Sequence, residues 1–370
     1  MHVEEMWKKT TGEGIKVAVI DSGVNPSTPA LKGQVLKGKD LSGTPGEETD
    51  DYRGHGTSVA ELIAGTGKGG GLQGVAPGAK IIPFRISDTE LQDEVKVNGF
   101  DQEQAIRAAA DSEAQIINVS MAGEFTSFGV RDAVHYAFSK GKLIFAGAGN
   151  NGNKDNKLQY PASFTEVVAV AATDPKGKVA DFSQHGESID IAAPGVDIPS
   201  WCDETLKRYC EGTQGTSFST AIASGGAALI WSAHPDWTAN QVLRVMFESA
   251  GRSKDWTPGS VSNYLGHGIS RPAAHINRGL GKPGDPDISP LTDKRSDGKP
   301  TAPASPSPSP ARSGEAAGTS GEPGAPGPEK AAATDGGGGG RTALIVGGAV
   351  AAVLVVGGAV AFARRRRQRA

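Results

Sequence analysis

Short, nearly continuous apolar runs alternate along this chain with alanine-rich segments, and this alternation limits the fold more than any other feature. The runs are rich in Val, Ile and Ala, as expected for strands covered on both faces of a sheet. They occupy residues 15–20, 80–86, 115–119, 143–146 and 167–171. Segments with helical spacing occupy residues 102–110, 131–140, 217–232 and 239–249, the last preceded by Thr238 as the expected N-cap. The alternation predicts an α/β fold with a parallel sheet flanked by helices.

The composition of the chain changes near residue 281. From there to Arg341, large apolar residues almost vanish, and Pro, Ser, Gly and Ala dominate. Such a stretch cannot bury enough apolar surface to offset the entropy lost on ordering it. We therefore expect one folded domain over residues 1–280 and a disordered linker over residues 281–341.

An uncharged run rich in Val, Ala, Leu and Gly follows at residues 342–363. As a helix it would extend about 33 Å, enough to cross a hydrocarbon core of about 30 Å. A buried core helix is the alternative, but a run that follows a disordered linker has nothing to pack against. The sequence thus predicts one transmembrane helix. The Arg-rich tail at residues 364–370 marks the cytoplasmic side, so the folded domain would lie outside the plasma membrane.

The first residues of the sequence do not have the pattern of an export signal. Residues 1–5 are polar and acidic and include no apolar segment of the kind that signal peptides carry. For a domain expected outside the cell, either Met1 is an internal methionine of a longer reading frame or a leader has been left out. The first fits better, because the expected fold would begin abruptly at residue 1.

Charge and cysteine content narrow the classes of function. Lys and Arg number 38 against 41 Asp and Glu, and the folded part has no basic stripe with interleaved aromatic residues. This balance disfavours nucleic-acid binding. Cys202 and Cys210 are the only cysteines, and in an extracellular domain such a pair is expected to form a disulfide. Two unpaired thiols are the alternative; no metal ligands at suitable spacing lie nearby, and no cofactor is expected.

Three segments place reactive residues where expected strands end and expected helices begin. An apolar run ends in Asp21, His55 begins a helix within Arg-Gly-His-Gly-Thr-Ser, and Ser217 begins another within Gly-Thr-Ser-Phe-Ser. Taken singly, each has an ordinary structural reading as a turn former, a loop or a helix entrance. Together and in this order they resemble the subtilisin-like family of serine peptidases, whose triad follows the chain order Asp, His, Ser. The resemblance covers about residues 11–277.

This resemblance implies a catalytic triad. Ser217 would attack the peptide carbonyl, and His55 would accept its proton and later donate it to the leaving amine. Asp21 would fix the tautomer of His55 and stabilise the imidazolium. Asn150 matches the family's asparagine that completes the oxyanion hole. The family's substrate-binding strand is matched by Ser120, Met121, Ala122 and Gly123.

Within the family, the architecture resembles that of mycosins, membrane-tethered peptidases associated with type VII secretion. The shared features are the Pro-rich linker, the single C-terminal span and the Arg-rich tail. Two positions depart from the family pattern, Ser219 in place of Ala and Ala221 in place of Pro, but neither supplies a proton or hydrogen bond that the mechanism needs. The sequence predicts a membrane-anchored serine endopeptidase that cleaves proteins or peptides outside the cell. The second hypothesis is a structural component that braces a membrane secretion complex, with proteolysis secondary.

Overall fold

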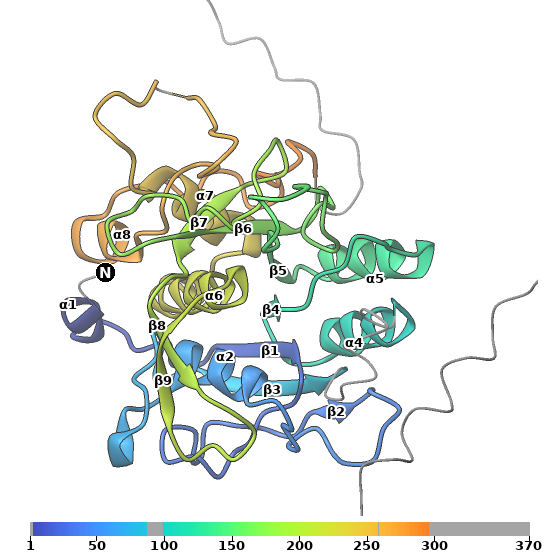
Figure 1. Ribbon diagram of the computed structural model, residues 1–370. Coiled ribbons are helices and arrows are strands. Elements are labelled where there is room, and N and C mark those ends of the chain that lie inside the picture. The colour runs from blue at the N-terminus through green and yellow to red at the C-terminus, as the bar shows by residue number, and fades with distance from the viewer. Residues whose placement is uncertain (1–2, 87–98, 258, 296–370) are drawn as a thin grey trace, which may run out of the picture. The chain divides into compact units, whose positions relative to one another are not determined.

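Seven parallel strands form the central sheet, in the order β2-β3-β1-β4-β5-β6-β7 (Figure 1). The computed structural model describes residues 3–86, 99–257 and 259–295. The strands of the sheet are β1 Lys16–Asp21, β2 Lys39–Asp40, β3 Lys80–Arg85, β4 Ile116–Val119, β5 Leu143–Gly147, β6 Val168–Thr173 and β7 Ile191–Pro194. A separate antiparallel hairpin consists of β8 Ile198–Trp201 and β9 Tyr209–Thr213.

Helices cover both faces of this sheet (Figure 1). Helices α4 and α5 pack on one face, whereas α2 and α6 pack on the other. The helices are α1 Val3–Trp7, α2 His55–Ala64, α4 Gly99–Asp111, α5 Phe128–Ser139, α6 Thr216–Ala233, α7 Ala239–Ser249 and α8 Pro272–Arg278, with a short 3-10 turn η1 at Lys68–Gly70.

Alternating residues of the central strands supply the two cores. In β1, Val17 and Val19 belong to the core shared with α2 and α6, whereas Ala18 and Ile20 belong to the core shared with α4 and α5. All four side chains are at most 1% exposed. A strand buried on both faces needs apolar residues at every position, which explains the continuous apolar runs of the sequence.

The carboxyl ends of the parallel strands bring the predicted site residues to one edge of the sheet. Asp21 is the last residue of β1, Ser120 follows β4, and Asn150 lies three residues after β5. Helices α2 and α6 begin at His55 and Thr216. Ligands of open α/β sheets bind at this edge.

The predicted parallel sheet with flanking helices is confirmed, and each strand and helix predicted within residues 1–280 has its counterpart. The N-cap at Thr238 is also confirmed, because its hydroxyl accepts from the Gln241 N–H and the Gln241 side chain accepts from the Thr238 N–H. Strands β2 and β7, the β8–β9 hairpin and helices α1 and α8 were not predicted. The four strands are short, with 2 residues in β2, 4 in β7, 4 in β8 and 5 in β9, and no residue of β2 or β9 is buried.

The C-terminal part of the described chain extends beyond the boundary predicted at residue 280. Residues 281–295 pack against α7: Thr238 Oγ1 and Asn240 Nδ2 both donate to the Pro286 carbonyl at 2.9 Å, and Arg244 donates to the Ile288 carbonyl at 3.2 Å. Side chains at Thr238 and within α7 thus donate to backbone carbonyls of this segment, and Leu291 packs partly buried against the core. Because carbonyl acceptors are present in every residue, the composition of the segment did not predict this attachment. None of the helices in residues 3–86, 99–257 and 259–295 has the length and apolarity of a membrane span. The predicted span at 342–363 lies outside the described residues.

Candidate active site

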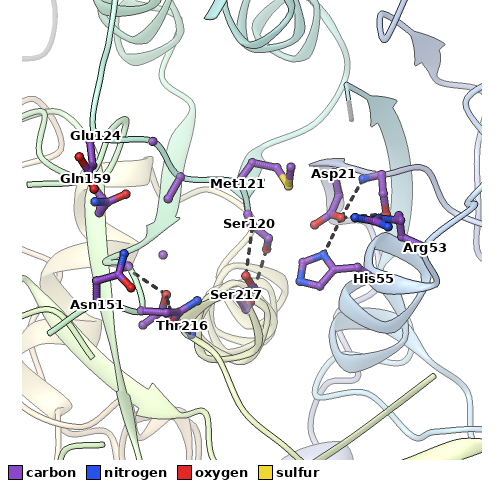
Figure 2. A pocket seen from close by; sticks show the side chains of 16 residues that line it. Asp21, Arg53, His55, Ser120, Met121, Glu124, Asn151, Gln159, Thr216 and Ser217 are labelled. Atoms are coloured by element: carbon purple, nitrogen blue, oxygen red, sulfur yellow. Dashed lines mark hydrogen bonds and ion pairs between the residues drawn. The ribbon is translucent and has the colours of Figure 1, made fainter. Parts of the chain in front are cut away.

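A cleft of about 480 Å³ opens at the carboxyl edge of the sheet. Figure 2 shows Asp21, Arg53 and His55 on one side of Ser217, and Glu124, Gln159 and Asn151 on the other. The cleft brings together residues that the sequence analysis took from five separate segments. Its lining consists of Asp21, Ser22, Arg53, His55, Ser120, Met121, Ala122, Gly123, Glu124, Gly147, Gly149, Asn150, Asn151, Gln159, Thr216 and Ser217.

The imidazole of His55 is held by a buried carboxylate. Its Nδ1 lies 2.7 Å from Asp21 Oδ1, and the Asp21 side chain is 0% exposed whereas that of His55 is 33% exposed. The same oxygen accepts from the backbone N–H of Ser22 at 2.8 Å. A carboxylate can only accept here, so the His55 proton resides on Nδ1 and leaves Nε2 free to accept a proton.

A second buried carboxylate organises the turn that leads into α2. Asp51 Oδ1 accepts from the Gly54 N–H and the Ser22 hydroxyl, and its Oδ2 accepts from the N–H and the hydroxyl of Thr57. These bonds satisfy a donor in the first turn of α2, where helical geometry provides no acceptor. His55 is the first residue of the helix, so the turn fixed by Asp51 also fixes its backbone.

The environment of His55 favours its protonated form. Burial lowers the pKa of His55, but the charge and hydrogen bond of Asp21 together outweigh burial, and the charge of Asp51 adds to them. The exposed guanidinium of Arg53 acts in the opposite direction. The pKa of His55 is therefore raised above its ordinary value of about 6.5.

Ser217 is the second residue of α6, so its backbone N–H belongs to the first turn and has no acceptor within the helix. Its hydroxyl donates to the Ser120 carbonyl at 3.1 Å, and among the described residues no hydrogen bond joins it to His55. The next residue, Phe218, packs its ring against the His55 imidazole, with ring centroids 5.7 Å apart. The serine and histidine helices are thus in direct side-chain contact.

The amide of Asn150 is fixed by the start of α6. Asn150 Oδ1 accepts from the backbone N–H of Thr216 at 2.9 Å and from the Thr216 hydroxyl at 3.1 Å. An amide whose oxygen is held in this way has its NH₂ group left as a donor for another acceptor. Asn150 lines the cleft together with Ser217, so both residues contribute an N–H donor to the cleft lining.

The segment Ser120 to Gly123 forms one wall of the cleft. Its far end is paired with another segment through Gly123, which exchanges two backbone hydrogen bonds with Tyr160 at 3.1 and 2.8 Å. Its near end is attached to α6 because Ser120 Oγ donates to the Ser217 carbonyl at 3.4 Å. The wall is completed by Met121 and Ala122, which make up the rest of the predicted segment.

Three structural residues near the site were not found by sequence reasoning: Asp51, Glu61 and Arg85. Arg85 is 0% exposed at the end of β3 and donates to the carbonyls of Glu47 and Pro45, in the loop that leads to α2. An acidic residue four positions before His55 could have been read as a capping group. Glu61 and Arg85 carried no such signal, because only the tertiary structure buries them.

Cys202 and Cys210 form a disulfide across the β8–β9 hairpin, with Cα atoms 5.0 Å apart. In the part of the chain that the structure describes, no group of three His, Cys, Asp or Glu side chains is arranged to hold a metal ion. A carboxylate, an imidazole and a hydroxyl converge on one cleft instead. Fold and site together define an α/β protein whose cleft holds the three side-chain types that serine hydrolases use.

Comparison with known proteins identifies the family to which the chain belongs. The model of the subtilase family, Peptidase_S8, matches residues 12–268. The chain belongs to the subtilase family and is a serine endopeptidase. Its described fold is the parallel sheet with flanking helices expected for that family.

Two curated relatives and one solved structure illustrate the similarity. The major intracellular serine protease of Bacillus subtilis is 37% identical over 238 residues, which are 62% of this chain and 72% of that protein. Thermitase of Thermoactinomyces vulgaris is 32% identical over 271 residues, 70% of this chain and 91% of that protein. The structure of the serine protease MycP1, described as an essential component of the type VII (ESX-1) secretion system, is 29% identical with a TM-score of 0.62, covering 74% of this chain and 86% of that one. The predicted likeness to mycosins is therefore confirmed.

Proposed function

We propose that Asp21, His55 and Ser217 form the catalytic triad of this endopeptidase. The observation that carries the proposal is the 2.7 Å bond between His55 Nδ1 and the buried Asp21 carboxylate, in the same cleft as the Ser217 hydroxyl. That bond directs the lone pair of Nε2 away from Asp21. A neutral imidazole with this tautomer is the general base that a serine hydroxyl needs.

In the acylation step, Ser217 Oγ bonds to the carbonyl carbon of the peptide while its proton passes to His55 Nε2. Substrate binding along Ser120 to Gly123 would turn the hydroxyl from the Ser120 carbonyl toward His55, since catalytic hydrogen bonds often tighten only in the bound complex. The C–N bond then breaks, and His55 returns the proton to the departing amine. The product of this half reaction is an acyl-enzyme on Ser217.

In the second half reaction, water replaces the amine. His55 accepts a proton from the water as its oxygen bonds to the acyl carbon, and the C–O bond to Ser217 breaks with return of the proton to Oγ. Asp21 stays ionised throughout and stabilises the imidazolium. Because the bond cleaved is a peptide bond, the substrates are proteins or peptides.

The oxyanion of both tetrahedral intermediates would be bound by the Asn150 NH₂ group and the Ser217 N–H. Both groups are held before substrate arrives, the first by Thr216 and the second by α6. Donors fixed in this way stabilise developing charge without a cost of reorganisation during the reaction.

We infer further that residues 342–363 anchor the protein in the plasma membrane, with the peptidase domain outside and residues 364–370 in the cytoplasm. The support is the uncharged run and the arginines that follow it. Protease added to intact cells should release the domain by cutting within the linker, and a tag placed after Arg369 should stay protected. An accessible tag with a protected domain would reverse this topology.

A role as a structural component of a secretion complex is a second candidate, favoured by the similarity to MycP1. Ser217→Ala in the full chain separates the two functions, because Ala lacks only the hydroxyl and the helix start should persist. If peptide cleavage and secretion fall together, the peptidase function carries the phenotype. If cleavage is lost while secretion persists, and only deletion of the domain abolishes secretion, the structural role carries it.

A further inference from the structure

The β8–β9 hairpin is connected to both helices that begin at the candidate active site. It packs beside α2, the helix that begins at His55 (Figure 1). From its last residue, Thr213, the chain continues directly to Ser217 in α6. One element therefore contacts the histidine helix and leads into the serine helix. Any contact that fixes the hairpin on α2 also bears on the separation of the two side chains.

A buried carboxylate joins the hairpin to α2. Glu61 of α2 is 0% exposed, and the hydroxyl of Tyr209 in β9 donates to Glu61 Oε2 at 2.7 Å. Tyr209 Oη in turn accepts from the Leu72 N–H at 3.2 Å. A buried carboxyl group is costly unless it is hydrogen-bonded. Burial raises the pKa of Glu61, and its hydrogen bonds offset part of that effect.

A second contact runs from the hairpin to the residue before the histidine. Trp201 of β8 stacks on Tyr209 with ring centroids 3.9 Å apart. The Trp201 backbone N–H donates to Ser58 Oγ at 2.9 Å, and that hydroxyl donates to the Gly54 carbonyl at 2.7 Å. This chain of contacts ends one residue from His55.

A third contact is made by the loop of the hairpin. Gly54 has φ +74°, and a Cβ at this position would lie 2.8 Å from the Asp203 carbonyl oxygen. The loop thus approaches the backbone before His55 closely enough that only glycine fits. The disulfide between Cys202 and Cys210 closes this same loop.

We propose that the hairpin is a clamp that positions His55 against Ser217. Glu61, Trp201 and Tyr209 are its positioning residues, and the disulfide keeps the loop of the clamp closed. The cleft lining, within the described residues, includes none of the hairpin, so the clamp acts on the geometry of the base and not on substrate contacts. This proposal rests on the proposed function, since it concerns the same triad.

The test compares substitutions at the clamp residues in the full chain. Tyr209→Phe removes the hydroxyl bonded to Glu61 and keeps the stacking on Trp201. It should lower kcat by about tenfold with KM within about twofold, because a misplacement of about 1 Å can cost about 10²-fold. Glu61→Ala should act alike, whereas Glu61→Gln, which keeps an acceptor, should restore most of the rate. Tyr136→Phe is the matched control, because it removes a 2.6 Å tyrosine–carboxyl bond to Asp111, remote from the cleft.

The disulfide gives an independent arm of the test. Mild reduction should lower kcat of the wild-type chain with KM nearly unchanged, and it should have no further effect on the Cys202→Ser, Cys210→Ser double variant. Circular dichroism at the assay temperature verifies that each protein is folded. A kcat that stays at the wild-type value in both Tyr209→Phe and the reduced protein overturns the clamp. The clamp is also overturned if Glu61→Gln loses as much kcat as Glu61→Ala, because the hydrogen-bond acceptor at residue 61 would then have no effect. A wild-type chain that cleaves no peptide refutes the proposed function itself, which is a different result.

Discussion

The two sides of the cleft are built in different ways. On the histidine side, buried carboxylates hold the structure: Asp21 and Asp51 are 0% and 5% exposed, and each accepts hydrogen bonds from backbone and side chains around α2. On the serine side, backbone groups hold the side chains: the Thr216 N–H bonds Asn150, the Ser217 carbonyl bonds the Ser120 hydroxyl, and the Ser120 carbonyl bonds the Ser217 hydroxyl. Charged side chains position the residues of the histidine side, whereas backbone groups position those of the serine side.

This difference corresponds to what each side must do. In the proposed mechanism the histidine changes its charge during the reaction, and a fixed negative charge beside it favours the imidazolium. In the same mechanism the serine side receives a peptide and a developing oxyanion, for which neutral donors are already in place. On the histidine side, the removal of a charge should therefore lower activity most. On the serine side, the removal of a neutral donor should lower it most.

The largest effect among the following changes is expected on the histidine side. Asp21→Asn should lower kcat by about 10⁴-fold, because an amide neither favours the imidazolium nor enforces the productive tautomer. The measurement is steady-state kinetics on a peptide substrate. Asp111→Asn, at a carboxyl bonded to Tyr136 on α5, serves as the control. A kcat of Asp21→Asn within about tenfold of the wild-type value would show that the negative charge of Asp21 is not needed for activity.

A smaller loss is expected on the serine side. Asn150→Ala should lower kcat by about 10²–10³-fold and leave KM nearly unchanged, because an oxyanion donor acts mainly in the transition state. Asn153→Ala, at an exposed position of the same loop, is the control. Equal losses in kcat for both variants would mean that the loop, and not the Asn150 amide, is responsible.

The pH dependence of activity should report the charge on the histidine side. The protonated form of His55 cannot act as a base, so kcat/KM should rise with pH. Because Asp21 and Asp51 outweigh burial and raise the pKa of His55, the midpoint should lie above the ordinary value of about 6.5. A midpoint below that value would show that burial dominates over the carboxylates.

The smallest effect is expected from the exposed cation on the same side. Arg53 lowers the pKa of His55, so Arg53→Gln should move the midpoint of the pH profile upward. The shift should shrink in high salt, because exposed charges are screened. Arg131→Gln on α5 is the matched control. A downward shift would contradict the sign assigned to Arg53.

Much of the fold was predictable from local pattern. Strands buried on both faces have continuous apolar runs, and Asp21, His55 and Ser217 lie in short motifs at element ends. The contacts that hold them were not predictable, because they join distant segments: Asp51 with Ser22, Glu61 with Tyr209, and Asn150 with Thr216. A buried Glu61 or Arg85 looks in sequence like any surface charge.

The most direct test of the central claim is covalent labelling of the nucleophile. A fluorophosphonate probe reacts with a serine whose hydroxyl is activated by a neighbouring base, and peptide mass spectrometry locates the adduct. We predict one adduct on Ser217 in the folded full chain, lost in Ser217→Ala and reduced more than about tenfold in His55→Ala. Peptide cleavage by a chain that carries no adduct on Ser217, or an adduct on another serine, would contradict the assignment of the triad.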